Sequence, residues 1–248
     1  MTGEGGSPDA PAEKARRKAI HARLKFMLPH PRCELDFDSP WQLLVATILA
    51  AQSTDKGVNK VTPELFRRWP TPAKLARAPK PAVEVVIRPT GFYRNKAKAI
   101  CGAARVVTEK YGGEVPKDMA ALCTLPGVAR KTANVVLGTA FGINAGMAID
   151  THASRVAKRL ALTQKDDPVK IEMELCSQFP KRVWTALGHR LVLHGRYVCL
   201  ARRPKCAECP INELCPSALS APELAWRTRA RAAEKTMLEQ HRPTRPTH

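Results

Sequence analysis

Apolar residues recur along this chain with the spacing of an α-helix, and no convincing run alternates with the two-residue period of a β-strand. The clearest helix begins at Ser39 and Pro40, because serine is a good N-cap and proline suits the first helical position. One face of this helix carries Trp41, Leu44, Val45, Ile48 and Leu49. Further helices are expected over 12–28, 55–69, 72–78, 80–88, 94–111, 118–123, 129–141, 151–161, 168–178 and 184–197. The sequence therefore predicts an all-α fold.

The chain is strongly basic, with 41 Lys and Arg residues against 22 Asp and Glu residues and a formal net charge of +19. Such an excess favours a polyanionic partner (DNA, RNA or an anionic membrane surface) over a protein that is merely kept soluble by its charge. Most of the positive charge falls within 13–216, so we expect the folded part to bind this partner. The longest apolar stretches, 43–51 and 135–149, are too short or too interrupted to cross a bilayer, which makes a membrane the weaker candidate.

The two ends of the chain differ in composition from its middle. Residues 1–12 are rich in glycine, proline and alanine and are expected to form a disordered tail. After Cys215 the apolar pattern weakens, and 217–248 is expected to be a basic C-terminal tail in which 222–240 has the composition of a basic helix. The N-terminus lacks the apolar core and early positive charge of a secretory signal, which favours a cytoplasmic location.

The segment 125–136 combines a tight turn with the start of a helix. Gly127 is free to adopt a positive φ angle, and it follows Pro126, whose φ angle is fixed. The first backbone N–H groups of the following helix have no partner within it, so they are suited to binding a phosphate beside the charge of Arg130. Lys131 stands at the positive end of the helix dipole. From these residues alone, a phosphate-binding lysine is favoured over a catalytic one.

Four cysteines near the end of the folded body have the spacing C-x6-C-x2-C-x5-C: Cys199, Cys206, Cys209 and Cys215. Thiols this close in sequence suit one metal centre, either zinc or an iron–sulfur cluster, and the ligand type alone does not decide between the two. In a reducing compartment a disulfide framework is not expected. The other four cysteines are scattered and are expected to be core thiols: Cys33, Cys101, Cys123 and Cys176.

A basic loop lies between the first two cysteines of this group. It carries Arg202, Arg203 and Lys205, and Pro204 stiffens it. If metal ligation fixes both ends of the loop, its cations are held outward at low entropic cost. Phosphate contact is therefore favoured over an ordinary solvated basic loop.

The hairpin segment, the sequence Asp150-Thr151-His152 and the cysteine spacing occur together and in this order. This combination resembles the endonuclease III family of DNA repair glycosylases over roughly residues 15–216. The resemblance implies a helix–hairpin–helix DNA glycosylase fold of two helical lobes, with a DNA-binding cleft between them and the target nucleotide flipped out. A six-helix barrel lobe with the hairpin would comprise 33–146. Residues 13–32 and 147–216 would form the lobe that carries a [4Fe–4S] cluster on the four cysteines.

The same resemblance implies two catalytic roles. Lys131 matches the family's nucleophile, whose neutral amine attacks C1′ of the sugar and forms a Schiff base. Partial burial, Arg130 and the helix N-terminus would each favour the neutral amine. Asp150 matches the family's essential carboxylate, which would accept a proton or stabilise the cationic sugar. Its position directly before the helix 151–161 also suits an N-cap, and both roles can coexist.

Further residues match the family's DNA contacts. Gln52 matches the glutamine that fills the hole left by the flipped base, although an exposed helix end accounts for it equally well. Phe92 lies where the family has an apolar wedge, usually leucine, and a core aromatic residue is the alternative. In the hairpin, Gly127, Ala129 and Arg130 would contact DNA. Ala129 replaces a second glycine, so it would cost about 1 kcal/mol if this position requires a positive φ angle.

These expectations combine into one function. The chain would be a monomeric, bifunctional DNA glycosylase in base excision repair that acts on double-stranded DNA containing damaged bases or abasic sites. It would remove oxidised pyrimidines and cleave the abasic site by β-elimination, close to the nucleoid if the chain is bacterial. One alternative is an adenine-mismatch glycosylase, which typically lacks the hairpin lysine. A non-catalytic DNA-binding module with a structural metal site is the other.

Overall fold

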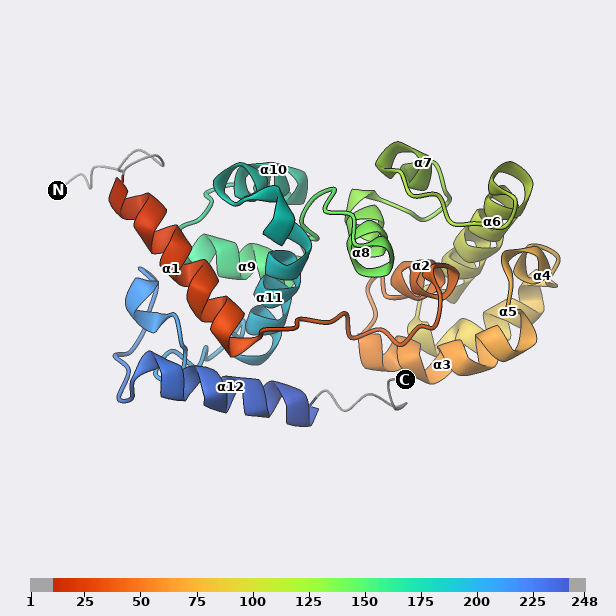
Figure 1. Cartoon of the computed structure of the whole chain (residues 1–248). Coiled ribbons are helices and arrows are strands. Elements are labelled where there is room, and N and C mark those ends of the chain that lie inside the picture. The colour runs from red at the N-terminus through yellow and green to blue at the C-terminus, as the bar shows by residue number, and fades with distance from the viewer. Residues whose placement is uncertain (1–10, 241–248) are drawn as a thin grey trace. The chain divides into compact units, whose positions relative to one another are not determined.

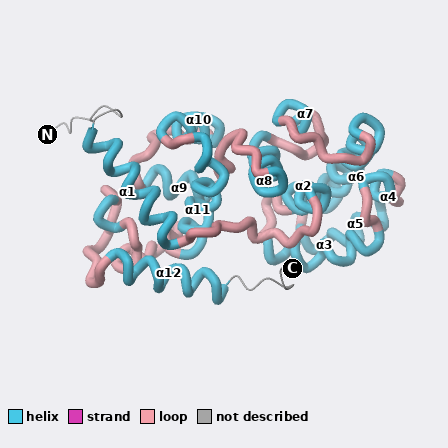
Figure 2. The backbone as a smooth tube through the Cα atoms, viewed as in Figure 1, coloured by secondary structure: helices cyan, strands magenta, loops and turns pink. Residues whose placement is uncertain are grey.

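The computed structural model describes residues 11–240, and within them the chain forms helices and loops with no β-strand (Figures 1 and 2). The α-helices are α1 (Pro11–Met27), α2 (Pro40–Leu49), α3 (Asp55–Arg68), α4 (Pro72–Ala76), α5 (Lys80–Ile87), α6 (Tyr93–Tyr111), α7 (Met119–Cys123), α8 (Arg130–Phe141), α9 (Thr151–Arg159), α10 (Pro168–Gln178), α11 (Trp184–Tyr197) and α12 (Trp226–Gln240). Three short 3-10 helices are added: η1 (Arg88–Thr90), η2 (Lys181–Val183) and η3 (Asn212–Leu214). The prediction of an all-α fold is confirmed.

Side-chain caps explain why several of these helices begin where they do. Ser39 Oγ accepts a hydrogen bond from the Gln42 backbone N–H at 3.2 Å, and Pro40 occupies the first helical position. Thr54 caps α3 and Asp167 caps α10 in the same way. Each cap satisfies an N–H group that the helix itself leaves without a partner.

The chain divides into two compact units, and each is described by itself. One unit comprises Cys33–Gly146 and contains α2 to α8 with η1. Its fully buried side chains come from most of these helices and include Leu43, Leu44, Leu49, Leu65, Leu75, Ile87, Ile100, Leu122 and Leu137. This core supports the hairpin between α7 and α8.

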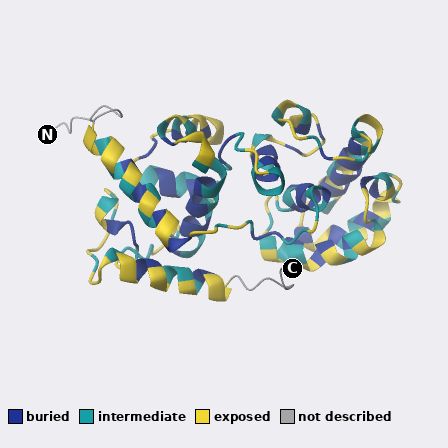
Figure 3. Ribbon diagram, in the orientation of Figure 1, coloured by how far each residue is buried: buried dark blue, intermediate teal, exposed yellow. Residues whose placement is uncertain are grey.

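The other unit comprises residues 11–32 and 147–240 of the described chain and contains α1 and α9 to α12. Its core is a cluster of buried apolar side chains that includes Ile20, Leu24, Met27, Val156, Ile171, Leu175, Leu187 and Leu191. Figure 3 colours the buried parts of the ribbon dark blue. Helices α9 and α11 pack extensively against each other within it. This packing positions the segment that begins at Asp150.

Two expectations about the chain ends need correction. Helix α1 begins at Pro11, so the expected tail 1–12 ends earlier, and residues 1–10 lie outside the described residues. Within the expected basic tail 217–248, the basic helix expected over 222–240 is present as α12, but Ala230 and Met237 are buried in the core cluster, so α12 is packed into this unit. The remainder, 241–248, lies outside the described residues. Nowhere in 11–240 is a helix both long and apolar enough to span a bilayer.

Candidate functional site

The hairpin turn is packed tightly into the unit Cys33–Gly146. Gly127 has a φ angle of +78°, in the left-handed region that favours glycine. A Cβ atom added to it would lie 2.8 Å from Ala99 Cβ of α6 and 3.2 Å from Ile48 Cγ2 of α2. Glycine is therefore required here both for its backbone angle and for the close approach of two helices.

The helix that follows the turn presents the candidate nucleophile. Helix α8 begins at Arg130, and Ala129 precedes it in an extended conformation with φ −93° and ψ 169°. Position 129 thus needs no positive φ angle, so the condition under which alanine would be strained in this hairpin is not met. Ala129 supplies no side-chain cap, which leaves the first-turn N–H groups of α8 without that partner. Lys131 is exposed, so the partial burial expected for it is wrong as well.

Two further predicted DNA contacts are exposed residues with left-handed backbones. Helix α2 ends at Leu49, and Gln52 lies in the turn beyond it with a φ angle of +52°. Phe92 is the N-cap of α6, has a φ angle of +46°, and is 64% exposed. This exposure rules out a core role for Phe92 within its unit. Such angles are costly for residues other than glycine and are found most often at functional sites.

A buried lysine that sequence reasoning missed supports the turn before Phe92. Lys96 is 5% exposed, and its Nζ atom donates a hydrogen bond to the Thr90 carbonyl oxygen at 2.7 Å. Burial lowers the pKa of Lys96. The available signal was its place on the buried face of α6, beside Ala97 and Ile100. This bond fixes the backbone that carries Phe92.

Asp150 is the N-cap of α9, as its position predicted. Its Oδ1 atom accepts hydrogen bonds from the backbone N–H groups of His152 and Ala153, both at 2.8 Å. Both of these hydrogen bonds end on Oδ1. The carboxylate is thus held by one oxygen, and the other is left for a substrate or a proton.

Two arginines of α9, which the sequence analysis did not single out, hold the segment around Cys199. Arg155 Nε donates to the Cys199 carbonyl oxygen at 3.0 Å. Arg159 donates to the carbonyl oxygens of Leu200 at 2.7 Å and Ala201 at 3.0 Å, and its Nη1 atom lies 3.3 Å from Cys199 Sγ. The helix that Asp150 caps is therefore bonded at its other end to the start of the basic loop.

The four clustered cysteines line a single cavity together with Val156, Leu160, His194, Val198, Ile211 and Asn212, among others. Within 11–240 no three His, Cys, Asp or Glu side chains converge as a single metal ion would require. Four clustered thiols suit either a zinc ion or an iron–sulfur cluster, so the ligand set alone does not choose between them. Burial raises the pKa of Cys209 to about 12, and coordination to iron ions would offset this cost of forming a thiolate.

The basic loop presents its cations outward. Arg202 and Arg203 are exposed, Lys205 is half-buried, and none of them forms an ion pair with a described residue. Arg203 has a left-handed φ angle of +52°. The loop closes through the Lys205 backbone N–H, which donates to the Val198 carbonyl oxygen at 3.1 Å. These three charges are therefore available to phosphate groups.

Comparison with protein families agrees with this arrangement. The family described as HhH-GPD superfamily base excision DNA repair protein matches residues 45–181. A second one, the iron-sulfur binding domain of endonuclease III, matches residues 199–215 and so spans all four clustered cysteines. The chain belongs to the endonuclease III family.

Individual relatives support this membership. Endonuclease III of Synechocystis sp. is 51% identical over 84% of this chain and 94% of its own length. Endonuclease III of Escherichia coli is 44% identical over 82% of this chain and 95% of its own length. A solved endonuclease III–DNA complex has a TM-score of 0.79 and 42% identity, and the match covers 83% of this chain and 96% of that one. A trapped covalent endonuclease III–DNA intermediate matches with a TM-score of 0.79 at 41% identity, over 83% of this chain and 96% of that one.

Several expectations are thereby confirmed. The chain has the helix–hairpin–helix glycosylase fold of the endonuclease III family. It is a base excision repair enzyme with DNA glycosylase and AP lyase activity, and DNA is its partner. It binds a [4Fe–4S] cluster.

Proposed function

We propose that this enzyme removes oxidised pyrimidines from duplex DNA and then cleaves the abasic site, with Lys131 as the nucleophile and Asp150 as the catalytic carboxylate. The observation that carries the proposal is the exposed Lys131 in the first turn of α8, directly after a turn packed through Gly127. A nucleophile on a rigid support meets its target with little entropic cost. A trapped covalent endonuclease III–DNA intermediate is among the matched structures, which supports a covalent mechanism.

The proposed reaction begins with the neutral amine of Lys131. Its Nζ atom forms a bond to C1′ of the damaged nucleotide, and the base leaves with the electrons of the C1′–N bond and gains a proton. Opening of the sugar ring and loss of the amine proton give a Schiff base between Nζ and C1′. Removal of a C2′ proton then expels the 3′ phosphate by β-elimination, and water releases the sugar fragment from Lys131.

Asp150 has one oxygen suited to this reaction. Its Oδ1 atom is held by two backbone N–H groups, which fixes the carboxylate in place. Its Oδ2 atom would accept the proton or stabilise the positive charge that develops on the sugar. N-capping of α9 and catalysis therefore use different oxygens of the same side chain.

DNA would be held by two kinds of contact. The backbone of Gly127, Ala129 and Arg130 at the start of α8, together with the cations of the basic loop, would bind phosphates. The exposed side chains of Gln52 and Phe92 would occupy the gap left by the flipped nucleotide. Arg202, Arg203 and Lys205 are the basic-loop members of the phosphate set.

Cys199, Cys206, Cys209 and Cys215 would be the four ligands of the [4Fe–4S] cluster. When bound, the cluster would crosslink the two ends of the basic loop and restrict its motion. We further propose that the enzyme acts as a monomer in the cytoplasm, with duplex DNA carrying damaged bases or abasic sites as its substrate. A light-scattering mass equal to one chain would support the monomer.

The function is tested with duplexes that contain thymine glycol or an adenine opposite 8-oxoguanine. The proposal predicts release of thymine glycol followed by strand cleavage, and loss of both in Lys131→Gln. Lys170→Gln, which changes an exposed lysine of α10, is the matched control and should retain both activities. Release of adenine without release of thymine glycol would instead support the mismatch glycosylase.

A further inference from the structure

Helix α12 lies beyond the segment that matches the family's iron–sulfur domain, which ends at residue 215. The two relatives above are covered over 94% and 95% of their own lengths, but they cover only 84% and 82% of this chain. This chain therefore has residues for which those relatives offer no counterpart. The described part of its C-terminal region is a helix, and that helix is packed into the unit that carries the cysteines.

One arginine of α12 is turned inward onto the cysteine segment. Arg229 is only 2% exposed. Its Nη1 atom donates a hydrogen bond to the Cys209 carbonyl oxygen, and its Nη2 atom donates to the Glu213 carboxylate. A buried guanidinium is costly unless it is paired, so these two bonds hold Arg229 and the segment between Cys209 and Cys215 in one arrangement.

The same segment is also tied to α1. Arg23 Nη1 lies 2.5 Å from Glu213 Oε2 and donates to the Pro210 carbonyl oxygen at 3.1 Å. Glu213 therefore joins an arginine of α1 to an arginine of α12. Two charge-assisted bonds to one carboxylate form a small network in which each bond supports the other.

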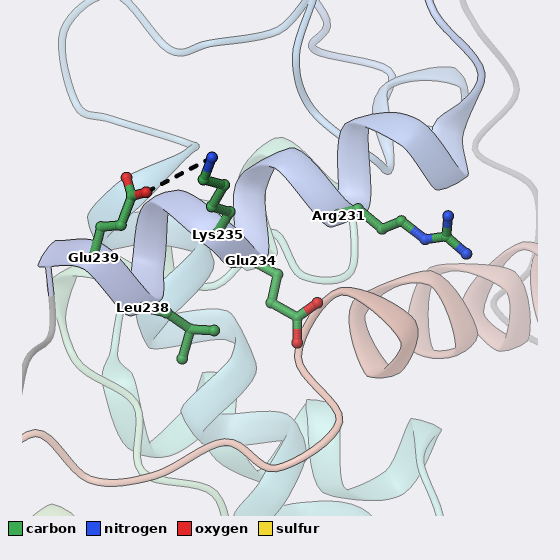
Figure 4. A pocket seen from close by; sticks show the side chains of 5 residues that line it. All are labelled: Arg231, Glu234, Lys235, Leu238 and Glu239. Carbon is green, nitrogen blue, oxygen red and sulfur yellow. Dashed lines mark ion pairs between the residues drawn. The ribbon is translucent and has the colours of Figure 1, made fainter.

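Aromatic and apolar contacts hold α12 itself in place. The Trp226 ring lies 5.2 Å from the Phe26 ring of α1 in an edge-to-face arrangement, and the Arg23 guanidinium lies 5.0 Å from the Trp226 centroid. Farther along the helix, Met237 is buried. Figure 4 shows a different face of α12, whose side chains are Arg231, Glu234, Lys235, Leu238 and Glu239. Arg229 is thus held inward by contacts at both ends of the helix, whereas Arg231 is exposed.

We propose that α12 stabilises the bound iron–sulfur cluster against loss. Through Arg229 it holds the Cys209 backbone and Glu213, and so it slows the opening of the Cys206–Cys215 segment and the loss of the cluster. The proposal rests on the ligand set given under Proposed function. Arg229 is a positioning residue, because it acts through the backbone of Cys209 and contacts neither DNA nor the reacting atoms. Opening the segment would first break both charge-assisted bonds of Arg229, and this raises the barrier to cluster loss.

The test measures how fast the visible absorbance of the cluster bleaches, and how fast iron is released, when a chelator is added to the full-length holoenzyme below its unfolding temperature. Arg229→Gln should lose the cluster on the order of tenfold faster than the wild type. Arg229→Lys, which keeps the charge but has one donor nitrogen in place of three, should lose the cluster at an intermediate rate. Arg231→Gln removes an exposed charge from the same helix and should match the wild type.

Met237→Ala distinguishes the proposed role of Arg229 from a purely structural role of α12. This variant removes a buried apolar anchor and leaves the groups around Arg229 intact, so it should lower the melting temperature without an equal increase in bleaching rate. The proposal is overturned if the bleaching rate of Arg229→Gln is within twofold of the wild-type rate. It is also overturned if the bleaching rate increases in proportion to the loss of melting temperature by the same factor in Arg229→Gln and Met237→Ala. Iron content in Cys209→Ser tests the ligand set separately, because a full cluster in that variant would contradict the proposed ligands and not the proposed role of Arg229.

Discussion

Gly195 of α11 lies so close to His152 of α9 that a Cβ atom added to it would be 2.8 Å from the His152 carbonyl oxygen and 2.9 Å from His152 Cβ. The His152 backbone N–H is one of the two groups that hold Asp150 Oδ1. The position of the first turn of α9, and with it the candidate catalytic carboxylate, therefore depends on Gly195 of another helix. Its lack of a side chain permits this close approach.

Gly195→Ala should displace the start of α9. We expect a loss of about 1–3 kcal/mol in the free energy of unfolding, the usual cost of overpacking a tight contact. Base excision in single-turnover kinetics should slow on the order of tenfold or more, because Asp150 moves with its helix. Gly188→Ala is the control, since an added Cβ there would be 3.3 Å from the Ala148 backbone N and needs a smaller adjustment. Equal rates in the Gly195 variant and the wild type would contradict this role.

Phe92 offers a pair of variants that separates backbone strain from function. Both Phe92→Gly and Phe92→Ala remove the exposed ring, so both should slow base excision on the order of tenfold while abasic-site binding weakens. Only glycine relieves the left-handed φ angle of +46°. The glycine variant should therefore be more stable than the alanine variant by about 1 kcal/mol in denaturant unfolding. Unchanged excision in both variants would remove Phe92 from the DNA-contact set.

Most of the fold was predictable from the sequence because helix boundaries depend on local signals. Caps and prolines such as Ser39, Pro40 and Asp150 mark helix starts, and the long helices begin and end within a few residues of their predicted limits. The composition of 222–240 predicted a basic helix, but the packing of α12 against α1 has no local signal in the sequence. The assignment of 217–248 as a tail therefore did not anticipate this packing.

Backbone angles and long-range contacts were the features that sequence reasoning missed. Ala129 replaces a glycine of the family pattern, yet its φ angle of −93° shows that the turn needs only one left-handed glycine, Gly127. Gln52, Phe92 and Arg203 are three of the four non-glycine residues within 11–240 that have positive φ angles. All three had been selected for their chemistry, and only the structure revealed this shared strain, which is typical of functional positions.

The basic loop should contribute mainly through phosphate contacts. Arg202→Gln and Arg203→Gln should weaken binding to duplexes of any sequence and reduce the slope of log K against log salt concentration by about 1 for each contact removed. Neither side chain is paired with an acidic residue of the described chain, so folding stability should change little. Lys170→Gln serves as the control for a lost surface charge. Equal salt slopes in the wild type and in the three variants would contradict the assignment of Arg202 and Arg203 as phosphate contacts.

The stability of this enzyme should depend on pH through His21 of α1. Burial is the main cause that lowers the pKa of His21 below its usual value of 6.5, followed by the nearby charges of Arg190, Lys25 and Arg182. Below pH 6.5 the unfolded chain binds this proton more readily than the folded chain, so the free energy of unfolding falls as the pH drops through the folded pKa. His21→Phe should make that fall shallower in denaturant titrations at several pH values, and an identical pH profile would contradict the prediction.

Schiff-base chemistry at Lys131 is the central claim, and trapping with borohydride tests it most directly. The holoenzyme is incubated with a duplex that contains an abasic site in the presence of borohydride, and the covalent adduct is digested and sequenced by mass spectrometry. We predict that the reduced sugar is attached to Lys131 and that Lys131→Gln gives no adduct. An adduct on another amine, or an undiminished adduct in the Lys131 variant, would contradict the account.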